Sequence, residues 1–348
     1  MQLTSPRKDT IPSLDGIRGL ACLLVLFSHG GALGFYPTPG LSGYGESGII
    51  LFFALSGFLM YYHYFQSIQH SWRFSGVFLI RRFFRMYPPY AITLVLSCFF
   101  QGKIFISWME NVAFPTLTDY LLLQHVNGHF WTVVAEIKFY LLFPFLCIVL
   151  IFLPLEKNLK LLWLIIMWLA LCIINFKAHE PEILGTLKFF LVGIIAAYSY
   201  MNYPLKEYLP PQIWNFLLYI SIFGGAITLR IAYKMHLLNY ASAGMEVYVM
   251  ILAVIVILAS IYATERAGYI FTNPFLRFCG TISYSVYLIH VCIFTIIVRN
   301  IHSSPVTLTI VSYICLFISG LVFYLCIEKP ANDFGHRLSK KIRLFDHK

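Results

Sequence analysis

Apolar runs long enough to cross a lipid bilayer recur along almost the whole chain of 348 residues. A helix needs about 20 mostly apolar residues to cross the hydrocarbon core, and about ten such runs are present. They lie near residues 16–35, 48–65, 86–106, 129–153, 159–176, 183–201, 212–232, 246–264, 281–300 and 306–327. A backbone inside lipid must satisfy its own hydrogen bonds, so each run is expected to be a helix. The sequence therefore predicts an all-α integral membrane protein with about ten transmembrane helices.

Composition supports this interpretation, and the distribution of charge sets the orientation. The chain is 59% hydrophobic and 11% charged, whereas soluble domains average about 45–50% apolar and 25% charged residues. With the N-terminus inside, about two thirds of the 25 lysines and arginines lie in inner segments and about a quarter in outer segments, the bias of cytoplasmic loops. We therefore attribute the net charge of +10 to membrane orientation, expect both termini in the cytoplasm, and expect no nucleic-acid partner.

No polar stretch is long enough to form a separate soluble domain. We expect residues 1–348 to form a single membrane domain, with spans between residues 16 and 327 and a short basic cytoplasmic tail over residues 328–348. None of the 8 cysteines has CxxC spacing, so the sequence supports neither a disulfide framework nor a thiolate metal site. No metal is expected.

The first apolar run carries two residues whose side chains are energetically costly to place in hydrocarbon. They are Arg18 near its start and His29 deep inside it. At about 100° per residue these positions share one helix face, about 16 Å apart along the axis. Ionisable residues in a membrane normally face a polar cavity or a partner helix. We therefore expect a polar cavity along this face. The alternative is that Arg18 extends to the membrane surface while His29 only hydrogen-bonds a neighbouring helix.

Six short motifs follow one another along the chain. They are LDGIRGLACLLVLFSH (14–29), FFALSGFLM (52–60), RRFFRMYPPY (81–90), HFWTVVAEIKFYLLFP (129–144), SYSVYLIH (283–290) and EKP (328–330). Together they resemble the acyltransferase-3 family of bacterial integral membrane enzymes. The resemblance implies transfer of an acyl group, usually acetyl from cytoplasmic acetyl-CoA, to sugars of surface polysaccharides. It also implies a multi-pass location in the bacterial cytoplasmic (inner) membrane, and it implies that Arg18 and His29 are essential.

Transfer of an acyl group to a hydroxyl needs a general base, and histidine has an ordinary pKa of about 6.5 that suits this task. We therefore predict that His29 is the base. By helix rise, Glu136 lies at a similar depth in the fourth predicted span. Glu136 could orient His29 or stabilise its imidazolium, the part that an acid plays in a catalytic triad. The alternative is an ion pair of Glu136 with Lys138 or Arg230.

The donor would bring phosphate groups, which need cations on the cytoplasmic side. Arg81, Arg82 and Arg85 lie just before the third predicted span, and guanidinium groups bind phosphate in a bidentate manner. Arg18 is at a depth where it can meet the same ligand. We predict that these four arginines bind acetyl-CoA. The alternative is that the cluster only anchors the protein at the inner membrane surface.

Three further residues are candidates for substrate binding. Ser56 could hydrogen-bond a substrate, or could only bond a carbonyl of its own helix. Trp131 could stack on a sugar, although anchoring at the membrane interface is the commoner role. His290 could line the substrate tunnel or be purely structural. Many family members carry a polar residue where Ile50 stands here, and Glu46 is only a weak substitute for it.

The sequence as a whole predicts a membrane O-acyltransferase that uses acetyl-CoA as co-substrate. The predicted acceptor is a hydroxyl of a polysaccharide or lipopolysaccharide sugar, met on the outer side as a surface glycan or a lipid-linked sugar. Two other classes remain open. One is a transporter or flippase, because intramembrane ionisable residues also mark transport paths. The other is a non-catalytic partner in surface polysaccharide assembly.

Overall fold

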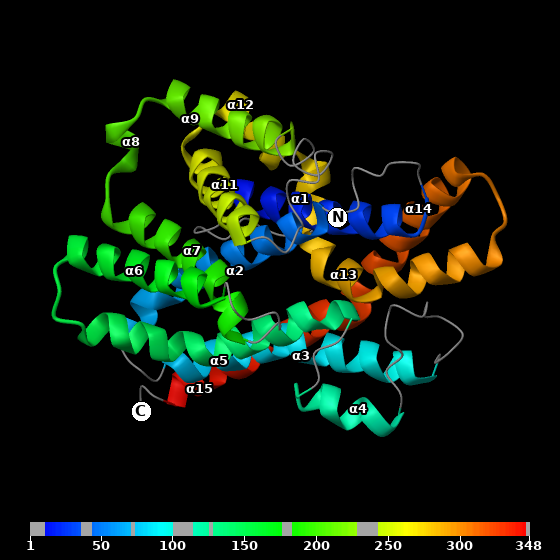
Figure 1. The fold of residues 1–348 in the computed structure, drawn as a ribbon. Helices are drawn as coiled ribbons and strands as arrows, with labels where there is room; N and C mark the ends of the chain where they lie inside the picture. The colour runs from blue at the N-terminus through cyan, green and yellow to red at the C-terminus, as the bar shows by residue number, and fades with distance from the viewer. Residues whose placement is uncertain are drawn as a thin grey trace.

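The regular structure of the described chain consists of helices (Figure 1). The computed structural model describes residues 11–35, 44–70, 74–99, 114–124, 128–175, 183–227 and 243–345. The helices are α1 (Pro12–Ala32), α2 (Tyr44–His70), α3 (Phe74–Phe99), α4 (Phe114–Leu121), α5 (Trp131–Phe152), α6 (Lys157–Asn175), α7 (Ile183–Asn202), α8 (Leu205–Tyr208), α9 (Pro211–Tyr219), α11 (Ala243–Tyr262), α12 (Glu265–Thr272), α13 (Pro274–Asn300), α14 (Pro305–Phe323) and α15 (Lys329–Phe345). Three short helical segments complete them, η1 (Gly128–Phe130), η2 (Ile220–Gly224) and η3 (Tyr324–Glu328).

The prediction of an all-α membrane protein is confirmed, and each predicted span overlaps a helix of the described chain. Among the described residues, 6 helical stretches are long and apolar enough to cross a bilayer. They are Tyr44–Phe65, Gly128–Phe152, Lys157–Ile174, Gly244–Tyr262, Glu265–Asn300 and Pro305–Lys341. The expected count of about ten spans is therefore approximate. Helices α1, α3 and α7 are not in this group, and each carries a cation within its length, Arg18, Arg85 and Lys188.

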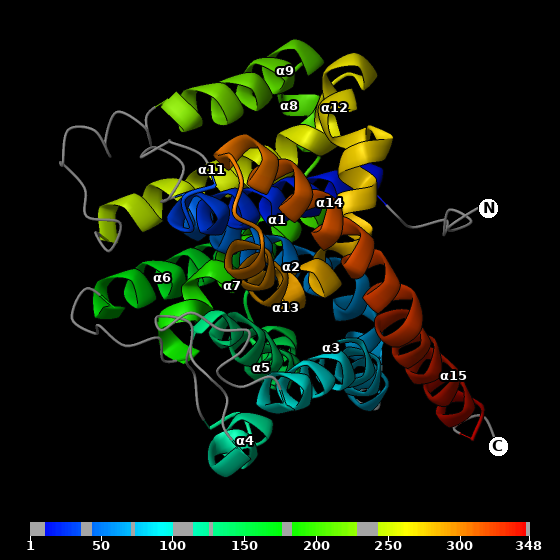
Figure 2. The same ribbon diagram turned by 90° about the vertical axis from the view of Figure 1, so that its right-hand side faces the viewer.

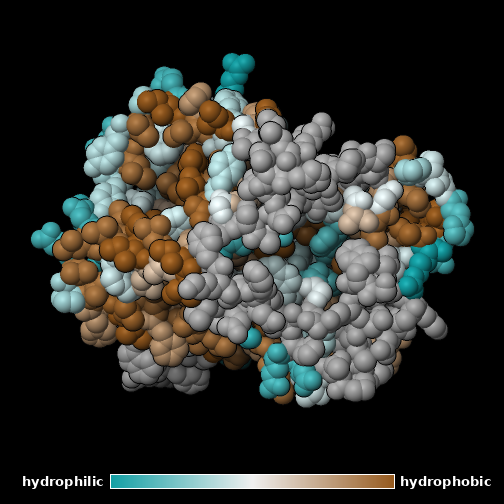
Figure 3. All heavy atoms as spheres, in the orientation of Figure 1, coloured by the Kyte–Doolittle hydropathy of each residue, from teal (hydrophilic) through white to brown (hydrophobic). Residues whose placement is uncertain are grey.

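Several helices expose large apolar side chains on the outer surface, as a protein surrounded by lipid requires. On α6, Leu162, Ile166 and Ile173 are 50%, 55% and 67% exposed. Figure 3 shows this helix as part of a broad hydrophobic face at the left of the molecule. Water would penalise so large an exposed apolar surface, whereas hydrocarbon does not. The exposed side chains of α6 therefore face the bilayer.

Glycines allow α1 to approach α13 closely, and this crossing positions the first helix. A Cβ atom added at Gly19 would lie 2.0 Å from the carbonyl oxygen of Leu276, and one added at Gly280 would lie 1.9 Å from that of Asp15. Small residues of this kind are what close helix contacts in membranes require. The crossing brings Gly19, the residue that follows Arg18, against the N-terminal half of α13.

A second close crossing joins α2 to α7. A Cβ atom at Gly57 would lie 2.1 Å from the carbonyl oxygen of Phe190, and one at Gly193 would lie 1.8 Å from that of Ala54. Ser56 is next to this contact on α2. The crossing therefore fixes the position of Ser56.

We expect Gly193→Ala to destabilise the protein by about 1–3 kcal/mol, the usual cost of overpacking. The added methyl group would meet backbone at Ala54, which cannot move aside as a flexible side chain can. The thermal unfolding midpoint of the purified protein in detergent would measure the effect. Gly76→Ala is the matched control, because a Cβ atom there meets nothing within 4 Å. Equal midpoints for the two variants would contradict the proposed role of the crossing.

Most of the segment expected to be the basic tail, residues 328–348, is helical in the described chain. Helix α15 continues from α14 through η3 and extends along α3 (Figure 2). Phe334 packs edge-on against Phe84 with ring centroids 4.9 Å apart, and Arg81 Nε donates a hydrogen bond of 2.8 Å to Ser339 Oγ. The segment can pack as a helix because its apolar side chains lie on one face and its cations on the other.

Candidate functional site

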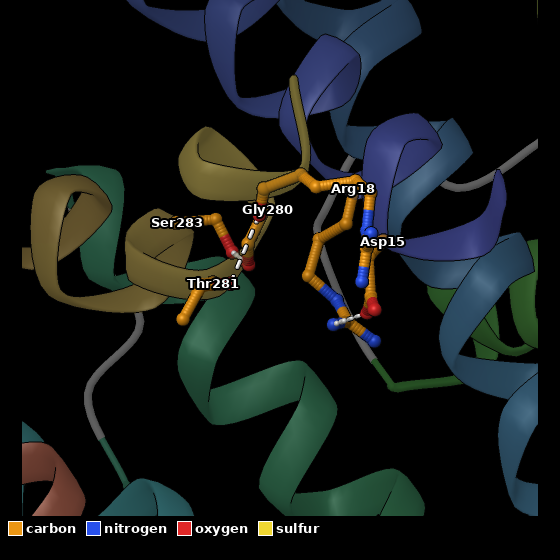
Figure 4. Close-up of polar contacts among 6 residues, drawn as sticks. Asp15, Arg18, Gly280, Thr281 and Ser283 are labelled. Atoms are coloured by element: carbon orange, nitrogen blue, oxygen red, sulfur yellow. Dashed lines mark hydrogen bonds and ion pairs between the residues drawn. The ribbon is translucent and has the colours of Figure 1, made fainter. Parts of the chain in front are cut away.

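Helix α1 places Arg18 and Asp15 one turn apart near its N-terminal end. Arg18 Nη1 donates a hydrogen bond of 3.2 Å to Asp15 Oδ1, and this is also an ion pair. Figure 4 shows the pair facing the stretch of α13 that contains Gly280 and Ser283. The Arg18 side chain is 18% exposed, so it retains access to a ligand while its charge is partly balanced.

A cavity of about 80 Å³ lies among α1, α2, α3, α5 and α13. Five residues predicted from the sequence line it together, namely Arg18, Ser56, Arg82, Arg85 and Glu136. Three cations, one carboxylate and one hydroxyl from these five residues therefore meet in one cavity. Such groups are expensive to bury without partners, so their convergence points to a polar ligand.

Glu136 accepts hydrogen bonds from two neutral donors. Ser56 Oγ donates to Glu136 Oε1 at 2.9 Å, and the Tyr140 hydroxyl donates to the same oxygen. Within the described residues Glu136 forms no ion pair with Lys138, and Arg230 lies outside them. Sequence analysis missed Tyr140, although its position four residues after Glu136 places both on one helix face.

Arg82 is held by aromatic rings. Its guanidinium carbon lies 5.0 Å from the ring centroid of Tyr64, 5.6 Å from that of Tyr140 and 5.9 Å from that of Phe78. Cation–π contacts of this kind stabilise the charge but leave hydrogen-bond donors unused. Arg82 Nε is buried and has no hydrogen-bond partner. A buried donor without a partner is costly, so this atom is suited to an anionic ligand that enters the cavity.

Arg85 lies in the field of a buried acid that sequence analysis did not select. Glu328, in η3, is 5% exposed, and Ser285 Oγ donates a hydrogen bond of 2.5 Å to its Oε2 atom. Its charge and that of Glu136 act on Arg85. The sequence did contain a signal for Glu328, because this residue is the first of the EKP motif (328–330). The negative charge of Glu328 therefore partly balances the guanidinium charge of Arg85, which lines the cavity.

Three histidines form a second polar group. His29 Nδ1 lies 2.7 Å from His290 Nε2, and the two rings are parallel within 1°. His129 meets His290 edge-on, with ring centroids 5.3 Å apart and planes at 78°. His290 is fully buried and His129 is 9% exposed, whereas His29 is only partly buried. His29 is therefore the accessible member of the group.

A pair of hydroxyl groups lies between the cavity and the histidines. Tyr287 and Thr132 both line the cavity. Thr132 Oγ1 donates to the Tyr287 hydroxyl at 2.7 Å, and that hydroxyl donates at 2.7 Å to the carbonyl oxygen of His129. His29 and Glu136 thus belong to separate hydrogen-bonded groups, and among the described residues no hydrogen bond joins them.

Two predicted site residues lie beside the cavity rather than in its wall. Trp131 begins α5 and packs edge-on against Phe53, a lining residue, at 6.0 Å. Arg81 is engaged with Ser339 of α15. In the part of the chain that the structure describes, no group of three or more His, Cys, Asp or Glu side chains could hold a metal ion.

Comparison with known proteins gives one broad result. A family model described as an acyltransferase domain matches residues 11–329. The chain is 27% identical to the peptidoglycan O-acetyltransferase OatA of Listeria monocytogenes serovar 1/2a, over 93% of this chain and 56% of that protein. It is 24% identical to a putative O-acetyltransferase of Staphylococcus aureus (strain COL), over 82% of this chain and 51% of that protein. The chain thus spans about half the length of these curated relatives. No solved structure matches it.

Proposed function

Because the chain belongs to the acyltransferase-3 family, we propose that it is a membrane O-acetyltransferase that takes the acetyl group of cytoplasmic acetyl-CoA. The proposed acceptor is a hydroxyl of a cell-surface polysaccharide or lipopolysaccharide sugar. The surrounding bilayer is the third partner, and the bacterial cytoplasmic membrane is the proposed location. The family, together with the O-acetyltransferase activity named for two relatives, supports acyl transfer.

The observation that carries the proposal is the cavity in which Arg18, Arg82 and Arg85 meet Ser56 and Glu136. Coenzyme A carries a diphosphate and a 3′-phosphate, and guanidinium groups are the side chains best suited to bind them. The unpartnered Nε atom of Arg82 supplies one such donor. An acetyl group at the end of the pantetheine arm is small enough to enter a cavity of about 80 Å³. Arg81 of α3 hydrogen-bonds Ser339 of α15 and is suited to bind a phosphate outside the cavity.

The proposed reaction is a direct transfer. The acceptor oxygen attacks the thioester carbonyl carbon while His29 takes the hydroxyl proton as general base. The carbon–sulfur bond then breaks, and the proton passes from His29 to the leaving thiolate to give free coenzyme A. Thr132 and Tyr287 line the cavity and bond the backbone of His129, so we propose that the acetyl group passes these two hydroxyls to reach His29. Trp131, beside the cavity, is proposed to stack on the acceptor sugar.

Purified protein in lipid nanodiscs, incubated with acetyl-CoA labelled in its acetyl group, tests the function. An acetyltransferase will release free coenzyme A and move the label to water or to an added glycan acceptor. A transporter or flippase will bind or move a substrate and leave the thioester intact. A non-catalytic assembly partner will do neither, and either of the last two results would overturn the proposal.

We expect Arg85→Ala to weaken acetyl-CoA binding by about 1.5–3 kcal/mol, which is the usual value of a hydrogen bond to a charged group. Arg85 lines the inner part of the cavity, so its loss removes a phosphate contact directly. Equilibrium binding of acetyl-CoA to the purified variant measures the effect. Arg266→Ala, which removes an exposed cation of α12, is the matched control. Unchanged affinity in folded Arg85→Ala would assign the arginine cluster to membrane anchoring.

A further inference from the structure

We propose that His290 is the positioning residue of His29: it accepts a hydrogen bond from His29 Nδ1 and so leaves His29 Nε2 unprotonated and free to act as the base. This inference rests on the proposed function for its catalytic meaning. It assigns to a histidine the orienting part that an acid plays in a serine triad. The sequence left His290 as a tunnel-lining or purely structural residue.

The first step is the hydrogen bond between His290 and its own helix. His290 Nδ1 lies 2.5 Å from the carbonyl oxygen of Tyr287. A carbonyl oxygen can only accept, so His290 Nδ1 must carry the hydrogen. His290 is fully buried, and no carboxylate hydrogen-bonds it among the described residues. Burial without an acid favours the neutral ring. Neutral His290 therefore presents a lone pair at Nε2.

The tautomer of His290 determines the tautomer of His29. The atom that faces His290 Nε2 is His29 Nδ1, at 2.7 Å. The ring centroids are 4.9 Å apart and the planes differ by 1°. That separation is about the nitrogen–nitrogen distance plus the two ring radii, so the rings lie edge to edge in nearly one plane. An N–H bond in the ring plane then points at the lone pair. His29 Nδ1 donates, and neutral His29 must have a free Nε2 atom.

His129 supports the pair without competing for it. His129 Nε2 lies 3.4 Å from the carbonyl oxygen of Leu288, which can only accept, so that nitrogen carries its hydrogen toward the backbone. The ring of His129 stands nearly perpendicular to that of His290. It therefore packs against the His290 ring and limits its rotation. His290 Nε2 remains available to His29 alone among the described residues.

In the proposed reaction, His29 takes up one proton and returns it, while His290 keeps its own. His29 Nε2 takes the hydroxyl proton as the acceptor oxygen bonds to the acetyl carbon, and the imidazolium that forms donates a charge-assisted hydrogen bond to His290 Nε2. When the carbon–sulfur bond breaks, His29 Nε2 returns the proton to the thiolate. His290 ends the cycle as it began, neutral with a proton on Nδ1. Its contribution is to hold the tautomer and to stabilise the imidazolium.

Two amide substitutions test the hydrogen bond. In His290→Gln the side-chain oxygen reaches the position of the original Nε2 atom and can accept from His29. In His290→Asn the amide is one methylene shorter, so it reaches the carbonyl of Tyr287 but not His29. We expect His290→Asn to lower kcat about 10- to 100-fold, less than the about 10⁴-fold loss for a charged orienting acid. His290→Gln should restore most of the rate, and KM for acetyl-CoA should stay unchanged in both. Equal rates for the two variants would overturn the proposal.

A spectroscopic measurement tests the tautomer without any enzyme assay. Solid-state NMR of the full chain, labelled with ¹⁵N-histidine and held in lipid bilayers, reports which ring nitrogens carry hydrogen. The variants His29→Gln and His290→Gln assign the signals. We expect His29 to be protonated at Nδ1 alone, and to lose this preference in His290→Asn. A wild-type His29 protonated at Nε2 would overturn the inference. The expected tautomer in a protein that never cleaves acetyl-CoA would instead overturn the proposed function.

Discussion

His29→Ala is expected to lower the turnover number for acetyl transfer by about 10²–10⁴-fold, the usual contribution of a general base. Binding of acetyl-CoA should not change, because His29 does not line the cavity. The arginines proposed to bind the phosphates of the donor do line it. Folding should also persist, since His29 is only partly buried and its main contact is the hydrogen bond to His290. Single-turnover rates, with the acetyl-CoA affinity measured in parallel, separate the chemical step from binding.

The matched control for this prediction is His302→Ala. His302 is an exposed histidine in the connection between α13 and α14, so its removal changes the histidine content without touching the histidine group. We expect its turnover to equal that of the wild type. Full activity in His29→Ala would exclude His29 from the chemistry altogether.

A covalent mechanism makes a different prediction for the same residue. If His29 itself accepted the acetyl group, an acyl-imidazole would form before the acceptor bound. Incubating the wild-type enzyme with labelled acetyl-CoA and no acceptor, followed by rapid denaturation, would then leave label on a peptide containing His29. We expect no such label, because a base only holds a proton. Stable label on His29 would replace the base mechanism by a two-step transfer.

The helices could be predicted from the sequence because lipid imposes a simple rule on length and hydropathy. The predicted span 129–153 and the observed helix α5 (Trp131–Phe152) differ by two residues at most. The convergence of Arg18, Ser56 and Glu136 on one cavity does not follow from depth, because counting along the spans places Glu136 level with His29, about 16 Å from Arg18 along the axis.

The partners of His29 could not be predicted in this way. Depth alone placed Glu136 beside His29, whereas the structure pairs His29 with His290, a residue 261 positions away. That contact depends on how closely α1 approaches α13. The approach is set by Gly19 and Gly280, whose missing side chains let backbone meet backbone. Helical periodicity reports which residues share a face, but it does not report which helix that face meets.

The segment after Glu328 shows a second limit of reasoning from composition. Its lysines and arginines predicted a basic tail in the cytoplasm, and they gave no sign that most of this tail is helix α15, packed along α3. The decisive features are small and local. Gly335 allows the ring of Phe84 to lie against the helix, since a Cβ atom there would come within 2.6 Å of Phe84 Cβ. A count of charges cannot detect a contact of this kind.

Glu136→Gln is the second variant with a large expected effect, a fall in turnover of about 10²-fold or more. Glutamine keeps the shape of the side chain and an oxygen that can accept from Ser56 and Tyr140. The change therefore removes the negative charge and little else. Because three arginines line the same cavity, removing that charge should not weaken the binding of an anionic donor. We expect kcat to fall while KM for acetyl-CoA stays the same or decreases.

Glu156→Gln, which neutralises an exposed acid before α6, is the control for the loss of a charge as such. If Glu136 only balances the arginines, then Glu136→Gln will lower thermal stability and leave kcat near the control. That outcome would remove Glu136 from the catalytic residues and retain it as part of the donor site. The two roles are thus separated by whether turnover or stability changes.

A double variant decides whether Glu136 acts through His29. Glu136 and His29 lie in separate hydrogen-bonded groups, so any coupling must act through the field or through the intervening Thr132 and Tyr287 hydroxyls. If Glu136 stabilises the imidazolium of His29, its charge has no function once the imidazole is gone. We then expect His29→Ala/Glu136→Gln to be no slower than His29→Ala alone, since residues that act as a unit are strongly non-additive. Independent losses that multiply would show that Glu136 acts on the donor and that His29 relies on His290 alone.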